Sequence, residues 1–373
     1  MRSITAVAAA IFASLLCSAG VILSSAASAG PALLFEPSNG KVLYAEDPDN
    51  QWHPASLTKI MTAYVTFEAI KQGKLKLTDK VACSLVATLQ PPSKVGLQVG
   101  AEITVDTALQ AVIVKSANDV TVMLAEAVSG NETAFVEKMN ATAKRLGMTR
   151  TNFVNTNGLP DPGQVTTARD LAKLARAVVT EYPEYAHYWA LPDMRIGKRR
   201  LGSHNALLKT FPGADGLKTG FTCDSGFNVV ASATRDGRRL MAVVLGETSG
   251  NERAVRAASL LEHGFQTSGW KELFNQTSLD SLPQDPAAKG VVSMRDAVYS
   301  GECGGHRRSR DTVAARNKAL KAKVASVKAK SAGKKKNEVH EARPALKGTQ
   351  VTPGDTQPAP KAAAVQPAGA KAQ

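Results

Sequence analysis

Alternating apolar and polar stretches near both ends of the central region predict two β-hairpins. The expected strands are residues 32–35, 42–45, 229–233 and 240–245. Asn39-Gly40 lies between the first two strands, and Asp236-Gly237 lies between the last two. Such dipeptides are typical of hairpin turns. We therefore expect two hairpins that join one antiparallel sheet.

Between these hairpins, apolar residues recur at the spacing of amphipathic helices. The expected helices are residues 57–70, 108–115, 120–128, 134–146 and 167–179, with a closing helix at 252–264. Strands at both ends with helices between them predict an α/β (α+β layered) fold, an antiparallel sheet covered by helices. Residues 30–275 are long enough to form one such domain around a single core.

The N-terminal segment is typical of a secretory signal peptide. No charged side chain occurs between Arg2 and Glu36, and an apolar run from Ile4 to Leu23 leads to Ala27-Ser28-Ala29. Small residues at this place favour cleavage after Ala29, so we expect residues 1–29 to be removed during export to the periplasm. An uncleaved membrane anchor is the alternative.

The last part of the chain has a different composition. Residues 276–373 hold 18 Lys and Arg against 8 Asp and Glu, which is +10 of the formal net charge of +14. The segment is rich in Ala, Lys, Pro and Gly and has one aromatic residue, Tyr299, so we predict a disordered basic tail. It could associate loosely with an anionic membrane or cell wall, and a weak basic amphipathic helix near 313–327 is an alternative. Because the excess charge lies in the tail, no nucleic-acid partner is expected for the body of the protein.

Three cysteines follow the expected cleavage site: Cys83, Cys223 and Cys303. The core, rather than a disulfide framework, must therefore hold the fold, and one bridge could form with partners that the sequence does not identify. Cys223 lies close to one of the motifs described next, but a buried or paired role is favoured over a catalytic one. No zinc-ligand spacing, phosphate-binding loop or dinucleotide fingerprint is present, so neither metal nor cofactor is expected.

Three short strings carry the candidate chemistry. They are Ser56-Leu57-Thr58-Lys59, Ser116-Ala117-Asn118 and Lys218-Thr219-Gly220. They match S-x-x-K, S-x-N and K-T-G, the serine-lysine set of enzymes that are acylated by β-lactams. Each string alone is common by chance, whereas all three in this order indicate one active site.

Ser56 is the candidate nucleophile and Lys59 its base. Their spacing places both side chains on one face of a helix, although a serine there could also be a simple helix cap. Lysine can accept the serine proton only when it is neutral, and burial near another cation lowers its pKa. Lys218 is the expected neighbouring cation.

The other two strings supply the remaining candidate groups. Ser116 is expected to relay a proton to the leaving amine, and Asn118 to hold Lys59 and to bind a substrate amide. Lys218 and Thr219 should lie on a strand and bind a terminal carboxylate, while Gly220 lets a peptide backbone approach. The N–H groups of Ser56 and Phe221 are the expected oxyanion donors.

These strings resemble the D-alanyl-D-alanine carboxypeptidases, the low-molecular-mass penicillin-binding proteins. The longer matching stretches are residues 54–62, 115–119, 215–222 and 226–237, with further matches at 90–94 and 157–159. The resemblance implies a β-lactamase/transpeptidase-like fold and an acyl-enzyme on Ser56. It also implies removal of the terminal D-alanine from peptidoglycan stem peptides, inhibition by β-lactams, and no metal or cofactor.

The chain departs from the family pattern in two ways. Many relatives carry a second β-rich domain and an anchoring helix, which residues 276–373 do not clearly show. Some relatives have histidine at the position of Phe221 and arginine near that of His204, so His204 is either a substitute carboxylate donor or a surface residue.

Other activities remain as alternatives. A D,D-endopeptidase that cleaves cross-links would use the same residues. A β-lactamase would need a glutamate in an E-x-x-x-N context, which is missing between Ser116 and Lys218, and a non-catalytic sensor would be expected to lack Ser56 or Lys59.

Overall fold

The computed structural model describes residues 30–267, 277–298 and 303. At its centre is an antiparallel five-stranded sheet in the order β2-β1-β9-β8-β7. Its strands are β1 (Ala32–Phe35), β2 (Val42–Glu46), β7 (Ala214–Thr222), β8 (Gly226–Arg235) and β9 (Arg238–Glu247). Both predicted hairpins are confirmed, and β1 pairs with β9, so segments from both ends of the domain meet in one sheet.

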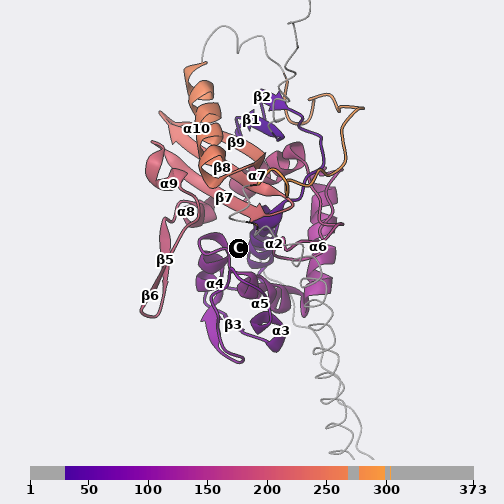
Figure 1. Ribbon diagram of the computed structural model, residues 1–373. Coiled ribbons are helices and arrows are strands. Elements are labelled where there is room, and N and C mark those ends of the chain that lie inside the picture. The colour runs from indigo at the N-terminus through magenta and orange to yellow at the C-terminus, as the bar shows by residue number, and fades with distance from the viewer. Residues whose placement is uncertain (1–29, 268–276, 299–302, 304–373) are drawn as a thin grey trace, which may run out of the picture. The chain divides into compact units, whose positions relative to one another are not determined.

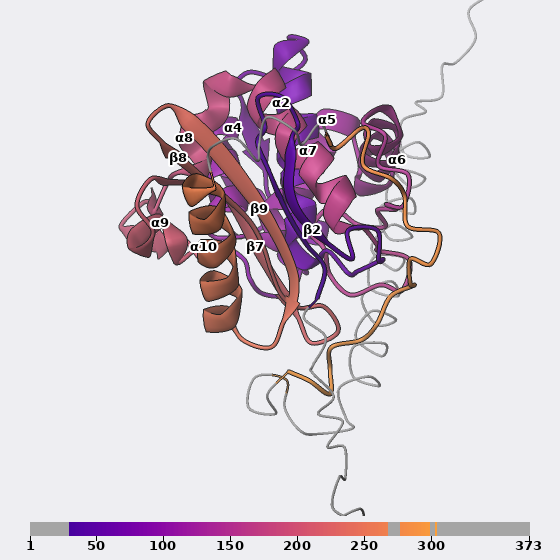
Figure 2. The same ribbon diagram turned by 90° about the horizontal axis from the view of Figure 1, so that it is seen from above.

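Helices cover both faces of this sheet (Figures 1 and 2). Helix α10 (Gly250–Gln266) lies on one face, and α2 (Thr58–Lys71) and α7 (Ala168–Glu181) lie on the other. The remaining helical segments are η1 (Ala55–Leu57), α3 (Leu85–Thr88), α4 (Val105–Ile113), α5 (Asn118–Ser129), α6 (Glu132–Arg145), η2 (Pro183–Tyr185), α8 (Ala186–Trp189) and α9 (Leu207–Thr210). The expected α/β layered fold is therefore confirmed, and each of the six expected helices is present with its ends shifted by a few residues.

The helix ends follow capping side chains rather than hydrophobic periodicity. Thr104, Asn131 and Ser249 each accept a hydrogen bond from the backbone N–H three residues later, at the starts of α4, α6 and α10. Such a bond satisfies one of the amides that the first turn leaves unpaired. The helices therefore begin two or three residues earlier than their apolar positions suggest.

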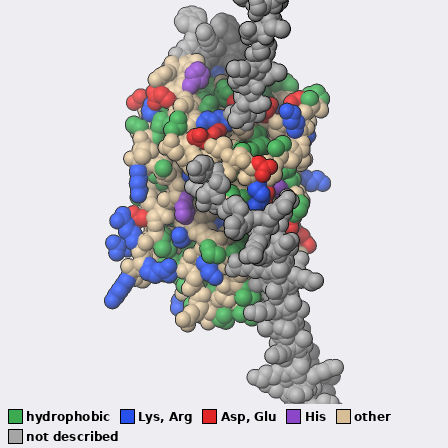
Figure 3. Space-filling view, viewed as in Figure 1, with side chains coloured by type: hydrophobic (Ala, Val, Ile, Leu, Met, Phe, Trp, Pro, Cys, Tyr) green, Lys and Arg blue, Asp and Glu red, His purple; other side chains and the backbone are tan. Residues whose placement is uncertain are grey.

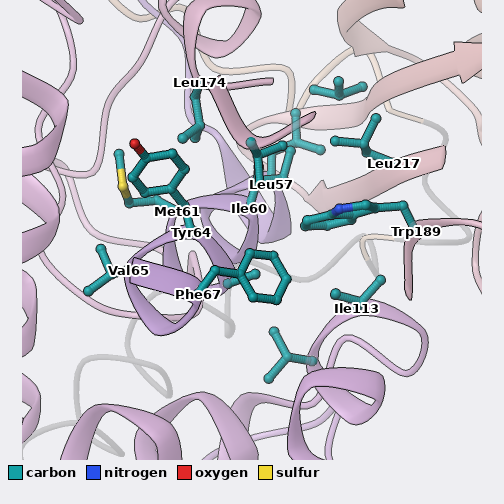
Figure 4. Packing of buried hydrophobic residues seen from close by; sticks show 14 of the residues in the cluster. Leu57, Ile60, Met61, Tyr64, Val65, Phe67, Ile113, Leu174, Trp189 and Leu217 are labelled. Carbon is teal, nitrogen blue, oxygen red and sulfur yellow. The ribbon is translucent and has the colours of Figure 1, made fainter. Parts of the chain in front are cut away.

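Helix α2 is deeply buried along most of its length. From Thr58 to Phe67 every residue of the helix is buried, so α2 has no polar face. Tyr64 and Phe67 pack in an aromatic cluster that includes Trp189, as Figure 4 shows. Because the core surrounds α2 on all sides, residues at its first turn are held rigidly.

A second apolar cluster lies between the sheet and α10. Leu34, Val229 and Leu240 of the sheet pack with Ala257 and Leu261 of the helix. Gly264 contacts this layer closely, since a Cβ there would lie 2.8 Å from Leu240 Cδ1. This packing fixes α10 against β8 and β9, and thereby fixes the first turn of α10.

Two small two-stranded sheets accompany the layered body and were not predicted. They are β3 (Lys80–Ala82) with β4 (Glu102–Thr104), and β5 (Asp193–Ile196) with β6 (Arg199–Gly202). Their strands have three or four residues, which is too short for an alternating pattern to stand out.

Residues 277–298, here called the strap, lie on the domain, so the prediction of disorder from residue 276 onward is wrong for this segment. Val42 N–H donates to the Thr277 carbonyl at 2.9 Å, and the Arg169 guanidinium donates to the carbonyls of Leu282 and Pro283 at 2.6 and 2.7 Å. Leu279 is buried. The strap has no aromatic residue, and the body supplies most of its partners, which a composition argument does not detect.

Two other expectations fall on parts of the chain outside the described residues. These are the signal peptide at 1–29 and the basic tail from 304 onward. Among the helices of the described ranges, none has the length and apolar character needed to cross a membrane.

Candidate active site

The three motifs meet at one cleft of about 420 Å³ between the sheet and the helices. Ser56 lies in η1 at the start of α2, Ser116 and Asn118 lie where α4 gives way to α5, and Thr219, Gly220 and Phe221 lie on β7. All six of these residues line the cleft. Lys59 and Lys218, the remaining two predicted site residues, are buried with 0% and 2% of their surface exposed.

Ser56 and Lys59 have the geometry of a nucleophile and its base. Lys59 Nζ lies 3.1 Å from Ser56 Oγ, and it donates to Asn118 Oδ1 at 2.7 Å and to the Asn157 carbonyl at 2.6 Å. All three neighbours of the amine are neutral oxygens. Among the described residues, no carboxylate contacts this amine.

The environment of Lys59 favours the neutral amine. Burial, followed by the positive charge of Lys218, holds the pKa of Lys59 well below its usual value, and the more distant Asp119 opposes this shift only in part. Burial and the charge of Arg253 also lower the pKa of Lys218, to about 7. A neutral lysine within hydrogen-bonding distance of a serine hydroxyl can remove its proton.

Ser116 occupies a strained position between α4 and α5. Its φ is +59°, and its Oγ is buried with no hydrogen-bond partner among the described residues. A buried hydroxyl without a partner costs about 1–3 kcal/mol. Because Ser116 also lines the cleft, a group bound there can provide the missing hydrogen bond.

Asn118 links the base to the wall of the cleft. Its Oδ1 accepts from Lys59, and its Nδ2 donates to the Pro91 carbonyl at 2.9 Å. The predicted role in holding Lys59 therefore fits the geometry. One N–H of the amide group is used by Pro91, which leaves the other for a ligand.

Strand β7 is an edge strand of the sheet and runs beside Ser56. A Cβ on Gly220 would lie 3.0 Å from both the Ser56 nitrogen and the Pro54 carbonyl oxygen, so only glycine fits there without displacing the backbone that carries Ser56. The edge position leaves one side of β7 open to an added peptide strand. The placement of Lys218-Thr219-Gly220 on a strand is confirmed.

Two further side chains line this end of the cleft, and one of them, Arg253, gives it positive potential. His204 lines the cleft and has a pKa lowered to about 4 by partial burial and by the charges of Lys218 and Lys115, so its imidazole is neutral near pH 7. Arg253, on the first turn of α10, is 8% exposed and lies over the Phe227 ring at 5.7 Å. Burial lowers the pKa of Arg253 to about 10.

Arg253 is the residue of the site that sequence reasoning missed. It lies outside the three strings, and only its position at the start of the closing helix could have drawn attention to it. No hydrogen bond or ion pair of its guanidinium is found among the described residues, although it faces the cleft. Such a group is suited to a carboxylate ligand.

The loop of residues 155–159 also contributes more to the site than its sequence match at 157–159 indicated. Its Asn157 carbonyl accepts from Lys59, and a Cβ on Gly158 would lie 1.7 Å from the Ala55 carbonyl oxygen. Gly158 has a φ of +83°, which glycine adopts without strain. The loop therefore positions both the base and the backbone next to Ser56.

Lysine and arginine side chains gather on the flank of the molecule formed by β5 and β6 (Figure 3). Arg195, Lys198, Arg199 and Arg200 are exposed there, and Arg199 donates to the Val95 carbonyl at 3.0 Å, next to the cleft wall at Ser93. The rim on this side of the cleft is therefore cationic and attracts anionic ligands.

Cys223 is not part of the catalytic geometry. It forms a disulfide with Cys303, and Cys83 is a buried free thiol. The expectation of a paired role for Cys223 is thus confirmed. In the described part of the chain, no group of three His, Cys, Asp or Glu side chains could hold a metal ion.

Comparisons with known proteins agree with this geometry. A family model described as D-alanyl-D-alanine carboxypeptidase matches residues 21–249. The chain is 37% identical over 254 residues to the D-alanyl-D-alanine carboxypeptidase DacF of Bacillus subtilis, a match that covers 66% of this chain and 65% of the relative. The matched part thus spans slightly less than two thirds of that relative's length.

Solved structures show the same similarity. Penicillin-binding protein 5 from Haemophilus influenzae has a TM-score of 0.62 and 38% sequence identity, covering 64% of this chain and 71% of the other. Penicillin-binding protein D2 from Listeria monocytogenes in a cefotaxime-bound form has a TM-score of 0.58 and 32% identity, covering 64% of this chain and 97% of the other.

Proposed function

The chain belongs to the D-alanyl-D-alanine carboxypeptidase family, and we propose that it is a serine-type carboxypeptidase that removes the terminal D-alanine from peptidoglycan stem peptides. The observation that carries this proposal is the contact of 3.1 Å between Lys59 Nζ and Ser56 Oγ, in surroundings that lower the pKa of the lysine. Among the described residues that line the cleft there is no Asp or Glu, so lysine and hydroxyl groups must move the protons.

Binding uses the open edge of β7. The peptide lies along this strand, and its terminal carboxylate is bound by Thr219, Lys218 and Arg253 at the cationic end of the cleft. The carbonyl of the penultimate D-alanine then lies between the N–H groups of Ser56 and Phe221. The cationic rim of β5 and β6 attracts the anionic substrate before it docks.

Acylation breaks the peptide bond between the two D-alanines. Neutral Lys59 takes the proton of Ser56, and Oγ attacks the carbonyl carbon to give a tetrahedral oxyanion. As the oxyanion collapses, the C–N bond breaks, and the proton passes from Lys59 through the Ser116 hydroxyl to the leaving amine. Free D-alanine departs and leaves an ester on Ser56.

Deacylation reverses these roles with water. Lys59 again accepts a proton, this time from a water molecule that attacks the ester carbonyl. The Ser56 oxygen leaves and recovers its proton, which releases the shortened peptide and neutral Lys59. A β-lactam follows the first half of this sequence when its amide opens on Ser56, and the resulting ester blocks the site.

The cellular setting extends this proposal. Removal of residues 1–29 as a signal peptide would deliver the enzyme to the periplasm, where trimming of stem peptides affects wall cross-linking and cell shape. The basic residues after 304 would hold it loosely at an anionic membrane or wall. Deleting residues 304–373 should then lower the salt concentration that elutes the protein from a membrane or wall fraction, and an unchanged elution would contradict this part.

Intact-protein mass spectrometry tests the catalytic proposal directly. The mature enzyme and Ser56→Ala are incubated with benzylpenicillin, and separately with a peptide that ends in D-Ala-D-Ala. We expect a penicilloyl adduct and free D-alanine with the unchanged enzyme only. An adduct without D-alanine release would favour an endopeptidase, and absence of any adduct would refute an acyl-serine mechanism.

A further inference from the structure

The backbone is strained immediately before the nucleophile. Ala55, the residue that precedes Ser56, has a φ of +48°. A residue with a side chain pays about 1–3 kcal/mol for this left-handed conformation and keeps it only where the surrounding structure holds it. Leu57 N–H donates to the Pro54 carbonyl at 3.2 Å, which closes the turn around Ala55 and Ser56. The turn therefore needs partners outside itself.

Asn228, on β8, supplies such partners from the sheet. It is fully buried, with 0% of its surface exposed. Its Nδ2 donates to the His53 carbonyl at 3.0 Å and to the Pro54 carbonyl at 3.3 Å. Its Oδ1 accepts from the Gly246 N–H on β9 at 2.9 Å. One carboxamide thus joins β8 and β9 to the two peptide groups that lead into Ala55.

A β-bulge lies at Asn228. The register between β8 and β9 shifts between Phe227 and Val229, so Asn228 has no partner residue on β9. Bulges of this kind re-aim a side chain and are common next to active sites. The bulge therefore lies where the sheet meets the segment that carries Ser56, and we connect it with the direction in which the Asn228 side chain points.

Gly220, on the neighbouring strand, leaves room for this contact. It pairs with Asn228 across β7 and β8. A Cβ on Gly220 would lie 3.0 Å from both the Pro54 carbonyl oxygen and the Ser56 nitrogen. The same carbonyl thus lies close to β7, where a side chain is missing, and is bound from β8, where a side chain reaches it.

The segment on both sides of this turn has anchors of its own. The Trp52 indole N–H donates to the Ser225 carbonyl at 2.8 Å, and Thr58 Oγ1 donates to the Ala55 carbonyl at 2.8 Å. Helix α2, which follows, is buried in the core. Loss of the Asn228 carboxamide would therefore leave the segment docked on the sheet and release only the turn at residues 53–56.

We propose that Asn228 is a positioning residue for the acylation of Ser56: its carboxamide fixes the turn at Ala55 and so places the Ser56 N–H, one of the two oxyanion donors. This rests on the acyl-serine function proposed above. An oxyanion donor acts most strongly where charge develops on the substrate oxygen, so its displacement weakens the tetrahedral state more than the bound peptide. Asn228 is not among the residues that line the cleft, so it acts through the Ser56 backbone.

The test separates these two states in Asn228→Ala. We would measure the rate constant of acylation by benzylpenicillin and the affinity for a boronic acid analogue of the peptide, which forms a tetrahedral adduct with Ser56 Oγ. The affinity for a peptide ending in D-Ala-D-Ala is measured in a Ser56→Ala background. All assays are run below the melting temperature of the least stable variant.

Asn140→Ala is the matched control. The Asn140 carboxamide also bridges to backbone, because it donates to the Phe153 carbonyl and accepts from the Phe153 N–H, both at 2.8 Å. Asn140 is on α6 and is not among the residues that line the cleft. It should lower the melting temperature and leave the acylation rate and both affinities unchanged.

In Asn228→Ala, the acylation rate and the boronate affinity should both fall about 100-fold, the loss expected when a reacting group is displaced by about 1 Å. The affinity for the peptide should stay unchanged. Asn228→Asp keeps the size of the side chain and the acceptor for Gly246 N–H, but even its protonated form donates at most one hydrogen bond where the amide donates two. It should change the same quantities in the same direction, and it serves as the test if Asn228→Ala does not fold.

Unchanged acylation in either folded Asn228 variant would overturn the inference. Equal losses of boronate and peptide affinity would also overturn it, because Asn228 would then only shape the cleft. An equal loss of acylation in Asn140→Ala would do the same, because it would trace the effect to lowered stability. Failure of the proposed function looks different: the unchanged enzyme would form no penicilloyl adduct and release no D-alanine, and the inference would fail with it.

Discussion

Replacement of Arg253 by methionine tests how the cleft recognises a carboxylate. Arg253 is 8% exposed and faces the cleft from the first turn of α10. A charge-assisted hydrogen bond at such a site contributes about 1.5–3 kcal/mol, and 1.4 kcal/mol corresponds to a factor of ten. Because little water reaches Arg253 to screen it, we expect kcat/KM for a D-Ala-D-Ala peptide to fall about 10- to 150-fold.

The assay pairs this peptide with its C-terminal amide, which has no carboxylate for Arg253 to bind. The variant should lose activity on the acid and retain it on the amide, so the ratio of the two kcat/KM values falls by the full factor. Arg256→Met is the matched control, since Arg256 lies one turn further along α10 and pairs with Glu247 and Glu46 at 2.7 and 2.8 Å. Equal losses on acid and amide would refute the reasoning.

Three further predictions concern stability and the fit of the backbone. The pKa of Lys218 is about 7 in the folded protein, against 10.5 for a freely solvated lysine. Between these values the unfolded chain binds more protons, so the free energy of unfolding rises with pH. In thermal melts from pH 7 to 10, Lys218→Met should flatten this rise. Gly158→Ala should abolish penicillin acylation, because its Cβ would overlap the Ala55 carbonyl. Gly100→Ala is the control: its φ is +82° with open space around it, so it should lower the free energy of unfolding by only about 1 kcal/mol and stay active. Two equally active variants would contradict this prediction. Arg169→Met leaves Asp49 buried without its ion-pair partner and removes the hydrogen bonds to the strap carbonyls. The melting temperature should therefore drop by an amount equivalent to about 3–5 kcal/mol, and limited proteolysis should cut the strap. An unchanged digest would show that other contacts hold the strap.

The sequence predicted the parts of the fold that have strong local signals. The two hairpins carry Asn-Gly and Asp-Gly turns, and the long helices repeat apolar residues over several turns. The catalytic strings were found because their chemistry requires fixed residue types at fixed spacing. Their convergence on one cleft then follows from the fold.

The features that were missed depend on contacts between distant segments. Arg253 looks like any arginine near a helix start, and its role arises only because α10 packs its first turn against Phe227. The strap was expected to be disordered because it was judged together with the basic tail, but Arg169 and Asp224 of the body hold it in place. The pairing of Cys223 with Cys303 likewise joins segments 80 residues apart, which spacing alone does not reveal.

The close fit at Gly220 limits how such an enzyme could become resistant to antibiotics. A larger side chain there would push on the Ser56 nitrogen and the Pro54 carbonyl. A substitution that blocks drug binding at this point would therefore also block binding of the proposed peptide substrate. A mutation that weakens drug binding but spares peptide binding must lie where the drug makes contact and the peptide does not. Selection under β-lactam pressure should therefore leave Gly220 unchanged.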